Sequence, residues 1–339
     1  MTRRVFCEAG MMSGKSKAQK RGSSTHHSGA VRDRKVLDLL AEFKDSAGEV
    51  LVVNDRGLLE HPHRWNWLSW GDAAGSTTPP NGPFDTILLR MPRTKATFLY
   101  ALHMCAGVLG EHGRLIVCGA NDEGAKSAGT LLEQVFERSG TIRTKAHCRI
   151  WEATGPKEGL KTRVEEWEES IESPFEGRNW YTYPGVFARG ELDDGTSLLL
   201  DCLPDLKGKK VLDFASGSGM ISAAALDRGA GQVTMLEVDA LAGLASARNV
   251  PEAQLVLSDG WSRLAPEPFD LIVSNPPIHQ GKVEDFSVLH ALVQRAPEYL
   301  FPDGSLIFVV QRQVPIPRLF GPKTFEILAE NPRFWVLAA

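Results

Sequence analysis

The chain has 339 residues, of which 42% are hydrophobic and 24% charged, and its formal net charge is −4. This length exceeds what one ordinary core holds and favours about two domains. The composition is typical of a soluble globular protein, and no stretch approaches the roughly 20 apolar residues of a membrane span. The net acidic balance argues against a nucleic-acid coat protein. We therefore expect a two-domain protein that does not enter a membrane.

Metal and disulfide chemistry finds little support in the sequence. The five cysteines are scattered, odd in number and never spaced as CxxC, and the nine histidines show no HExxH spacing. Zinc sites need such clustered ligands, and disulfide frameworks need paired cysteines. The pattern predicts a reducing compartment and no metal.

Residues 1–30 form a basic, polar segment. They carry six Lys or Arg and one acidic residue and are rich in Ser and Gly, which predicts a disordered leader. The segment lacks the long apolar stretch of a secretory signal. It is compatible with a tail that touches RNA, with an ordinary leader and, weakly, with an organelle transit peptide. We expect a cytoplasmic location, with an organelle as the alternative.

From about residue 31, strands alternate with helices in an order that occurs twice. Such alternation predicts α/β domains built on a parallel, doubly wound sheet, and the repetition indicates a duplication. In the first half we predict strands at 49–55, 84–90 and 113–122 and helices at 95–113 and 123–140. In the second half we predict strands at 209–214, 232–239, 253–259, 269–277 and 305–311 and a helix at 288–304.

An acidic stretch separates the two halves. Residues 152–178 contain eight acidic and four basic residues together with Pro and Gly, as linkers commonly do. The predicted organisation is a leader (1–30), a first domain (31–151), a linker (152–178) and a second domain (179–339).

The second half contains the pattern of a nucleotide-type site. In "VLDFASGSG" a strand ends at Asp213, and Gly217 and Gly219 allow the backbone to turn close to a ligand. Glu237 ends the next strand, where a carboxylate binds ribose hydroxyls, and Asp259 ends another, where it can accept from an adenine amine. Two alternatives stay open: Asp239 in place of Glu237, and a structural turn without a ligand.

The chemistry of this pattern favours an adenosine-bearing ligand that lacks phosphate. Phosphate binders place basic or hydroxyl residues beside the glycine loop, and no Lys or Arg occurs between Val211 and Asp227. A sulfonium ligand with a free ammonium group would instead be attracted by Asp213.

The loop "NPPIHQG" carries the candidate catalytic residues. Pro276 and Pro277 stiffen the chain as it leaves the strand, so Asn275 presents its side chain at a fixed place. The Asn275 oxygen and the Pro276 carbonyl are two acceptors that can bind both hydrogens of an exocyclic NH2 group. That grip would orient the nitrogen lone pair for attack, and positioning is worth up to about 7–11 kcal/mol in favourable systems. A Pro-Pro turn without function is the alternative.

The first half holds a degenerate copy of this loop, "FDTILLRMPRTKA". Arg90 stands at the position of Asn275, and Met91 stands at that of Pro276. The copy therefore cannot assemble the same site. Its basic side chains could hold RNA phosphates, which fix register without reading sequence, or they could be solvated loop residues. The residues in question are Arg90, Arg93 and Lys95, with Lys126, Arg143 and Lys145 as further candidates.

Three stretches carry a family resemblance: "YPGVFARGELDDGTSLLLDCLP", "VLDFASGSG" and "FDLIVSNPPIHQG". They resemble class I S-adenosylmethionine-dependent methyltransferases of the RsmC type, which methylate the N2 amine of guanine in small-subunit ribosomal RNA. The resemblance implies two tandem Rossmann-like methyltransferase domains, of which the first is degenerate, and S-adenosylmethionine as the cofactor. It also implies that the first stretch covers the cofactor site through Phe187, Asp193, Gly195 and Thr196.

The chain departs from the family pattern at two places. Ile278 stands where an aromatic residue usually stacks on the flipped base, a contact worth about 1–3 kcal/mol. The glycine loop reads Ala215-Ser216-Gly217 where Gly-Cys-Gly is common. We expect Ile278 beneath the base ring, and both departures bear on activity.

The resemblance implies an enzyme that acts on ribosomal RNA, a ribosomal subunit or an assembly intermediate, and we expect a monomer. The expected target is the N2 amine of a guanine that is unpaired or flipped, since this amine is otherwise buried in the duplex. The alternatives are a guanine-N2 methyltransferase of the large subunit, a protein-glutamine methyltransferase, and a non-catalytic assembly or RNA-binding protein that retains the fold.

Overall fold

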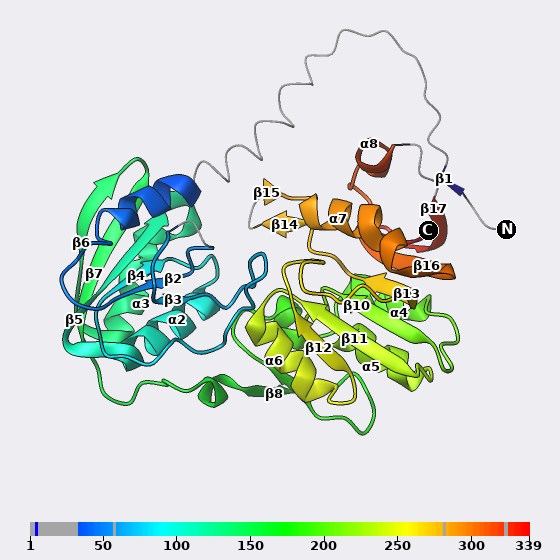
Figure 1. The fold of residues 1–339 in the computed structure, drawn as a ribbon, viewed down its shortest axis with the longest axis horizontal. Helices are drawn as coiled ribbons and strands as arrows, with labels where there is room; N and C mark the ends of the chain where they lie inside the picture. The colour runs from blue at the N-terminus through cyan, green and yellow to red at the C-terminus, as the bar shows by residue number, and fades with distance from the viewer. Residues whose placement is uncertain (1–3, 6–32, 57–58, 281–282, 322–324) are drawn as a thin grey trace, which may run out of the picture. The chain divides into compact units, whose positions relative to one another are not determined.

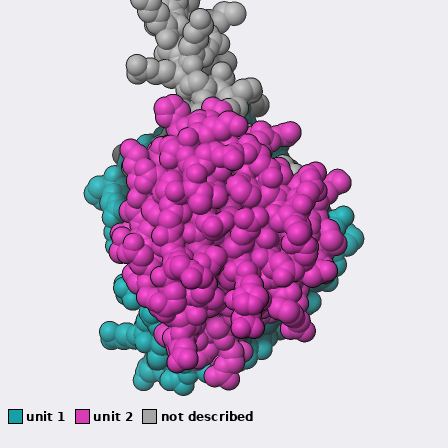
Figure 2. Space-filling view, turned by 90° about the vertical axis from the view of Figure 1, so that its left-hand side faces the viewer, with its two compact units in different colours: residues 1–17, 71–73, 169–339 teal, residues 18–70, 74–168 magenta. Residues whose placement is uncertain are grey.

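The computed structural model describes residues 4–5, 33–56, 59–280, 283–321 and 325–339 (Figure 1). The chain forms two compact units (Figure 2). The N-terminal unit comprises the described residues within 18–70 and 74–168, and the C-terminal unit comprises those within 1–17, 71–73 and 169–339. Of the predicted leader only β1 (Arg4–Val5) is described, and it pairs with β17 (Phe325–Glu330); the rest of residues 1–30 lies outside the described part of the chain.

The N-terminal unit is built on a six-stranded sheet of order β3-β2-β4-β5-β7-β6. Neighbours among β3, β2, β4 and β5 pair in parallel, whereas β7 runs antiparallel to both β5 and β6. The strands are β2 (Val50–Val53), β3 (Arg64–Trp65), β4 (Phe84–Arg90), β5 (Leu109–Ala120), β6 (Phe136–Lys145) and β7 (Cys148–Pro156). The helices are residues 33–41, α2 (Lys95–Val108) and α3 (Ala128–Val135), with short 3-10 turns η2 (Asn121–Glu123), η3 (Ala125–Ser127) and η4 (Val164–Trp167).

The C-terminal unit is built on an eight-stranded sheet of order β1-β17-β18-β16-β13-β10-β11-β12. Its remaining strands are β10 (Lys210–Phe214), β11 (Gln232–Glu237), β12 (Gln254–Leu257), β13 (Phe269–Ser274), β16 (Leu300–Gln311) and β18 (Phe334–Ala338). The helices are α4 (Asp194–Asp201), α5 (Met220–Asp227), α6 (Ala240–Asn249), α7 (Ser287–Arg295) and α8 (Ile316–Phe320), with η5 (Phe187–Gly190) and η6 (Ala296–Tyr299). Two small hairpins add β8 (Glu169–Ile171) to β9 (Trp180–Thr182) and β14 (His279–Gln280) to β15 (Val283–Glu284).

The two units share one sheet topology. The order β3-β2-β4-β5-β7-β6 matches β11-β10-β13-β16-β18-β17 strand by strand, and in both sheets the last two strands are antiparallel. This agreement supports the predicted duplication, and the predicted fold class of two tandem α/β domains is confirmed.

The antiparallel edge of each sheet corrects part of the prediction. A helix was expected over 123–140, but α3 ends at Val135 and Phe136 takes extended angles (φ −121°, ψ 146°). The chain then continues as β6, whose residues are mostly exposed. An exposed edge strand has no apolar run or alternation, so the sequence gives it little signal.

Strand alternation in the C-terminal unit sends side chains to two opposite layers. Leu212, Phe214 and Ile272 belong to one buried cluster, while Val211 and Leu271, their direct neighbours along the strands, belong to another. Successive residues of a strand point to opposite faces, and helices cover both faces here, so the central strands read as continuous apolar runs.

The predicted linker contains regular structure. Residues 152–156 belong to β7, and 164–167 form η4. The ring of Trp167 packs edge-on against Tyr100 and His103 of α2, with ring centroids 5.5 and 5.0 Å apart. Within the described residues, no helix is long and apolar enough to cross a membrane.

Asn249, at the end of α6, links three segments of the C-terminal unit through hydrogen bonds of its side chain. Its Nδ2 donates to the carbonyls of Tyr181 and Ser218, both at 3.0 Å, and its Oδ1 accepts from the Tyr181 N–H at 2.8 Å. The side chain is buried, with 3% of the residue exposed. A single amide therefore joins α6, β9 and the glycine-rich loop.

We expect Asn249→Ala to destabilise the C-terminal unit by about 2–4 kcal/mol, because it leaves buried backbone groups without partners. Urea unfolding followed by circular dichroism measures the change. Gln254→Ala, at an exposed position of β12, is the matched control and should change stability by less than about 0.5 kcal/mol. Equal stability of the two variants would contradict this role of Asn249.

Candidate functional site

The candidate site lies at the carboxyl edge of the parallel strands. β10 pairs with both β11 and β13 in parallel, so the ends of the three strands meet at one edge of the sheet (Figure 1). Asp213 lies near the end of β10, Glu237 ends β11, and Asn275 directly follows β13. Ligands bind at this edge in open α/β sheets.

Asp213 is fully buried, with none of its surface exposed. Its Oδ2 accepts from the N–H and the hydroxyl of Ser222 on α5, at 3.0 and 2.6 Å. Its Oδ1 has no hydrogen-bond partner within the described residues. Burial raises the pKa of Asp213 from 3.8 to about 7, and the Glu237 carboxylate adds to the rise against the lowering effect of Ser222. An unsatisfied buried oxygen of this kind calls for a ligand donor or a water.

Glu237 is also buried and anchors the glycine loop. Its Oε2 accepts from the Gly217 N–H at 2.8 Å, and its Oε1 accepts from the N–H groups of Val238 and Asp239 at 2.9 and 3.0 Å. Burial raises its pKa, and these backbone donors partly offset the rise. A carboxylate oxygen can accept two hydrogen bonds, so Oε1 is fully occupied and Oε2 keeps capacity for one ligand hydroxyl.

The loop between β10 and α5 has the backbone of a close-approach turn. Ala215, Gly217 and Gly219 have φ of 61°, 56° and 90°, in the left-handed region. A Cβ on Gly217 would meet nothing within 4 Å, whereas one on Gly219 would lie 2.9 Å from Val250. Gly217 therefore borders open space and Gly219 packs against the fold. The buried hydroxyl of Ser216 has no partner within the described part of the chain.

Two other acidic residues border this region. Asp239 caps the N-terminus of α6 by accepting from the Leu241 N–H at 2.8 Å, and burial raises its pKa to about 7. Asp259 follows β12 and is half-buried. Asp239 is occupied in capping, whereas Glu237 contacts the glycine loop, so the geometry favours Glu237 among the two alternatives. The role of Asp259 stays a prediction.

Asn275 is held by a segment distant in sequence. Its Nδ2 donates to Thr196 Oγ1 at 2.8 Å and to Asp193 Oδ2 at 3.3 Å. Pro276 after it is buried and Pro277 is exposed. From the resemblance, Asp193 and Thr196 were expected to cover the cofactor site. The spacing of Asp193 and Thr196 is typical of a helix N-terminus, but nothing in the sequence indicated their contact with Asn275.

The two apolar residues assigned to the site differ in exposure. Ile278 is 8% exposed and belongs to the same buried cluster as Phe214 and Trp261. It therefore offers little surface to a base. Phe187, in η5, is 65% exposed. Ile278 as the floor under a base and Phe187 as a cover both stay predictions, and the exposure makes Phe187 the more accessible of the two.

In the N-terminal unit, the expectation that Arg90 binds RNA phosphates requires correction. Arg90 is buried, 6% exposed, and its guanidinium pairs with Asp33 at 2.6 Å and Glu123 at 2.9 Å. Arg93 lies 3.8 and 3.5 Å from the same two carboxylates, with a side chain 29% exposed. Internal carboxylates thus occupy Arg90, which does not face the solvent. Lys95, at the start of α2, is exposed and remains a candidate.

Strand register shows what the N-terminal unit has in place of the site. Val52 pairs with Leu88 of β4 as Asp213 pairs with Val273 of β13, so an apolar residue stands where the buried carboxylate should be. By the same register Asn66 takes the place of Glu237. The loop backbone persists, since Asn54 and Arg56 have φ of 60° and 50°. Both units therefore have this turn, but only residues without a carboxylate, Val52 and Asn66, occupy the positions of Asp213 and Glu237 in the N-terminal unit.

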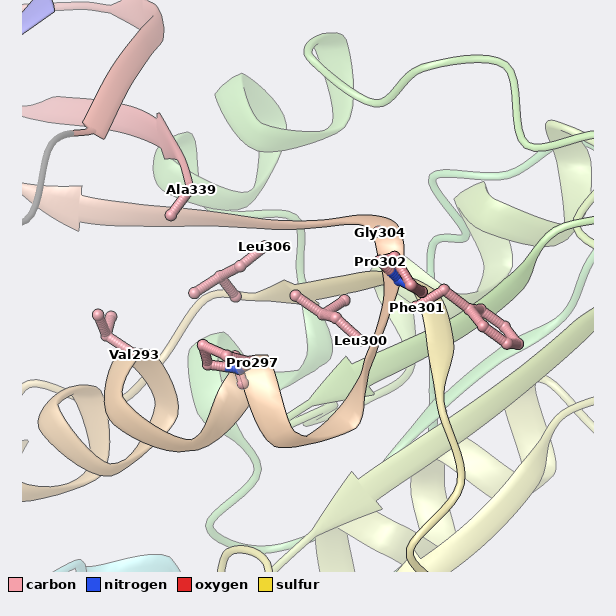
Figure 3. A pocket seen from close by; sticks show the side chains of 9 residues that line it. Val293, Pro297, Leu300, Phe301, Pro302, Gly304, Leu306 and Ala339 are labelled. Atoms are coloured by element: carbon pink, nitrogen blue, oxygen red, sulfur yellow. The ribbon is translucent and has the colours of Figure 1, made fainter.

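An apolar pocket of about 350 Å³ lies beside α7, η6 and β16 (Figure 3). It borders Leu300, which pairs with Phe269 at the start of β13, so it lies at the opposite end of the strands from Asn275. Its lining carries no titratable side chain: Val293, Ala296, Pro297, Leu300, Phe301, Pro302, Gly304, Leu306 and Ala339. No group of three potential metal-ligating side chains occurs among the residues that the structure describes.

Comparison with known proteins gives a consistent result. The methyltransferase small domain model matches residues 178–338, and the methyltransferase small domain N-terminal model matches residues 39–170. The ribosomal RNA small subunit methyltransferase C of Hahella chejuensis is 31% identical over 272 residues, 77% of this chain and 79% of that protein. The protein of the same name from Pseudomonas entomophila is 33% identical over 75% of this chain and 80% of its own.

A solved structure has the same fold over nearly the whole chain. It is a T. thermophilus 16S rRNA N2 methyltransferase (RsmC) in complex with AdoMet and guanosine, with a TM-score of 0.77 and 24% sequence identity. The match covers 90% of this chain and 91% of that one. The tandem arrangement of the two units is thus shared with a known protein.

The raised pKa of Asp213 predicts a pH dependence of stability. The folded protein keeps a proton that the unfolded chain releases between about pH 4 and pH 7, so the free energy of unfolding falls as pH rises through this window. Asp213→Asn stays neutral. Without ligand, the free energy of unfolding of the variant should exceed that of the parent by a margin that grows as pH rises. At about pH 8 we expect this difference to be on the order of a few kcal/mol. Urea titrations across this range test it, and a pH-independent difference between the two proteins would contradict it.

Proposed function

The chain belongs to the ribosomal RNA small subunit methyltransferase C family, and from this membership we propose that it transfers a methyl group from S-adenosylmethionine to the N2 amine of a guanine in small-subunit ribosomal RNA. The observation that carries the proposal is the orientation of Asn275. Its NH2 end donates to Asp193 and Thr196, so its Oδ1 is the end left to accept from a substrate amine.

The residues at the strand edge fit S-adenosylmethionine. Asp213 has a buried oxygen without a partner in the described residues, which suits the ammonium group of the cofactor. The open space beside Gly217 admits a ligand close to the backbone, and Glu237 Oε2 can still accept from one ribose hydroxyl. When bound, the cofactor supplies an electrophilic methyl group on a sulfonium.

Asn275 and Pro276 would grip the base amine. An exocyclic NH2 group offers two N–H donors, and the Asn275 oxygen and the Pro276 carbonyl are two acceptors on a chain stiffened by proline. Binding both hydrogens in the plane of these acceptors leaves the nitrogen lone pair on one side of the amine. Such orientation lowers the barrier without a strong general base, and well-placed reactants gain up to about 7–11 kcal/mol.

The substrate must present its amine outside a duplex. Guanine N2 lies in the minor groove of paired RNA, where a loop of this kind cannot enclose it. We infer a guanine that is unpaired or flipped out. The exposed Phe187 supports this inference, because an accessible aromatic ring can stack on a base.

We propose that the N-terminal unit serves RNA docking without chemistry. Val52 occupies the position of Asp213, the carboxylate proposed to bind the cofactor, and Arg90 occupies the position of Asn275, the amide proposed to bind the amine. Exposed Lys95 and Lys126 remain candidates for phosphate contacts, whereas Arg143 and Lys145 both pair with Glu42. A ribosomal substrate would place the activity in the cytoplasm or in an organelle that has ribosomes of its own.

One observation favours a second candidate function. The buried Ile278 gives the loop no open stacking platform, as expected if the chain assists ribosome assembly without methylating. A guanine of the large ribosomal subunit or a glutamine of a protein could bind Asn275 and Pro276 through its amine in the same way. The relatives named above are small-subunit enzymes, so they do not support either substrate.

Cofactor binding separates these candidates. We expect S-adenosylmethionine to bind the protein saturably in calorimetry and Glu237→Ala to weaken binding at least about 100-fold, because a charge-assisted hydrogen bond to the ribose and the anchor of the Gly217 N–H are both lost. Glu252→Ala removes an exposed carboxylate, half of whose side chain is accessible, and should bind like the parent. Absence of binding to the parent protein would favour the assembly role.

Catalysis depends on the amide. Asn275→Ala should lower kcat for methyl transfer to small-subunit ribosomal RNA about 10²–10³-fold while cofactor affinity changes little, because the lost acceptor contacts only the base. Asn81→Ala, an exposed amide of the N-terminal unit, is the control. Turnover measured with labelled S-adenosylmethionine decides the question, and unchanged turnover in Asn275→Ala would refute the mechanism.

A further inference from the structure

Three side chains form a hydrogen-bonded group beside the Asn-Pro-Pro loop. Asn275 Nδ2 donates to Thr196 Oγ1 at 2.8 Å and to Asp193 Oδ2 at 3.3 Å, and the Thr196 hydroxyl donates to the same Asp193 oxygen. Asp193 and Thr196 are about 80 residues from Asn275 in sequence and belong to a different element.

The hydrogen-bond donors and acceptors of Asp193 and Thr196 determine which end of the Asn275 amide faces them. The single hydroxyl proton of Thr196 goes to Asp193, so Thr196 can only accept from Asn275. An ionised carboxylate is likewise an acceptor only. Both neighbours of the amide therefore require a donor, and only the NH2 end supplies one. A flipped amide would place its oxygen against two acceptors.

The group is anchored at the start of a helix. Asp193 is the N-cap of α4, and its Oδ1 accepts from the N–H groups of Gly195 and Thr196 at 2.9 and 3.4 Å. The other oxygen is left for Thr196 and Asn275. A Cβ on Gly195 would lie 3.1 Å from the Phe334 ring, so the first turn is packed tightly against β18.

We propose that Asp193 and Thr196 are positioning residues that hold Asn275 by its nitrogen end, so that its oxygen faces the amine to be methylated. This inference rests on the proposed function and extends it. With the amide reversed, Asn275 would present N–H donors to the donor hydrogens of the substrate, and the grip would become repulsive. The helix cap thus selects the productive orientation before the base arrives.

Asp193→Asn is the discriminating variant. Asn caps helices as well as Asp does, so α4 should remain intact. The introduced amide can keep its oxygen on the cap and turn its NH2 group toward Asn275, which then favours the reversed orientation. We expect kcat for methylation of small-subunit ribosomal RNA to fall about 100-fold, with the Kd for S-adenosylmethionine within about 2-fold of the parent.

Asp194→Asn is the matched control, one residue along. Asp194 is exposed and pairs with Arg333 on the surface at 2.8 Å. Its variant should keep the parental kcat, because exposed ion pairs contribute little. If Asp193→Asn behaves like Asp194→Asn, Asp193 is a helix cap only and the proposal is wrong.

Thr196 gives an independent pair of variants. Thr196→Val keeps the shape but removes the hydroxyl, and should lower kcat about 10-fold because one of two acceptors for Asn275 is lost. Thr196→Ser keeps the hydroxyl and should restore most of the activity. Equal activity of the two variants would exclude a role for the hydroxyl.

A compensating change tests orientation directly. Asn275→Asp alone places a carboxylate against Asp193 and should be poorly active. Combined with Asp193→Asn, the introduced amide can donate to the introduced carboxylate, whose second oxygen then faces the base. We expect the double variant to exceed Asp193→Asn in kcat by about 10-fold. No recovery, with both proteins folded and binding cofactor, would overturn the proposal.

The proposed function and the positioning role of Asp193 are contradicted by different results. If the parent protein transfers no methyl group to ribosomal RNA, the proposed function is wrong, and the positioning role that rests on it is wrong as well. If the parent is active and Asp193→Asn is equally active, only the positioning role fails.

Discussion

The proposed chemistry depends on the hydrogen bonds that hold the nitrogen end of Asn275. Asp193 and Thr196 occupy that end, and Pro276 limits the backbone that follows, so an acceptor points from a fixed place at the sheet edge. The sheet brings this acceptor to the same edge as the buried Asp213 and Glu237. Methyl transfer between two bound molecules needs such fixed placement more than it needs a strong base.

The duplication separates what the fold requires from what the chemistry requires. Both units have the same order of six strands and the same left-handed turn after the first strand, seen at Asn54 and at Ala215. At the position where the C-terminal unit has the buried Asp213, the N-terminal unit has Val52. In the N-terminal unit Arg90 fills the corresponding loop start and pairs with Asp33 and Glu123. A buried cation must keep such partners, because an unpaired buried charge is strongly destabilising.

The fold could be predicted from the sequence where an element follows from a local pattern. Parallel strands, the glycine turn and the Asn-Pro-Pro loop are local patterns, and together they predicted the tandem α/β fold. Prediction failed where a residue's role depends on a distant partner. From its local sequence Arg90 was expected to be an accessible cation, but in the folded unit it is buried and paired with Asp33 and Glu123. The link between Asp193 and Asn275 spans 82 residues and has no local signature beyond an N-cap pattern. The exposed strand β6 lacks the apolar spacing by which strands are recognised.

Nucleoside mass spectrometry of small-subunit ribosomal RNA tests the central claim most directly. RNA from cells that carry the gene is compared with RNA from cells that lack it and from cells that carry the Asn275→Ala form. The account predicts one N2-methylguanosine that is present in the first and absent from the other two. A methyl group on a ring nitrogen, or an unchanged level of N2-methylguanosine in all three, would contradict it.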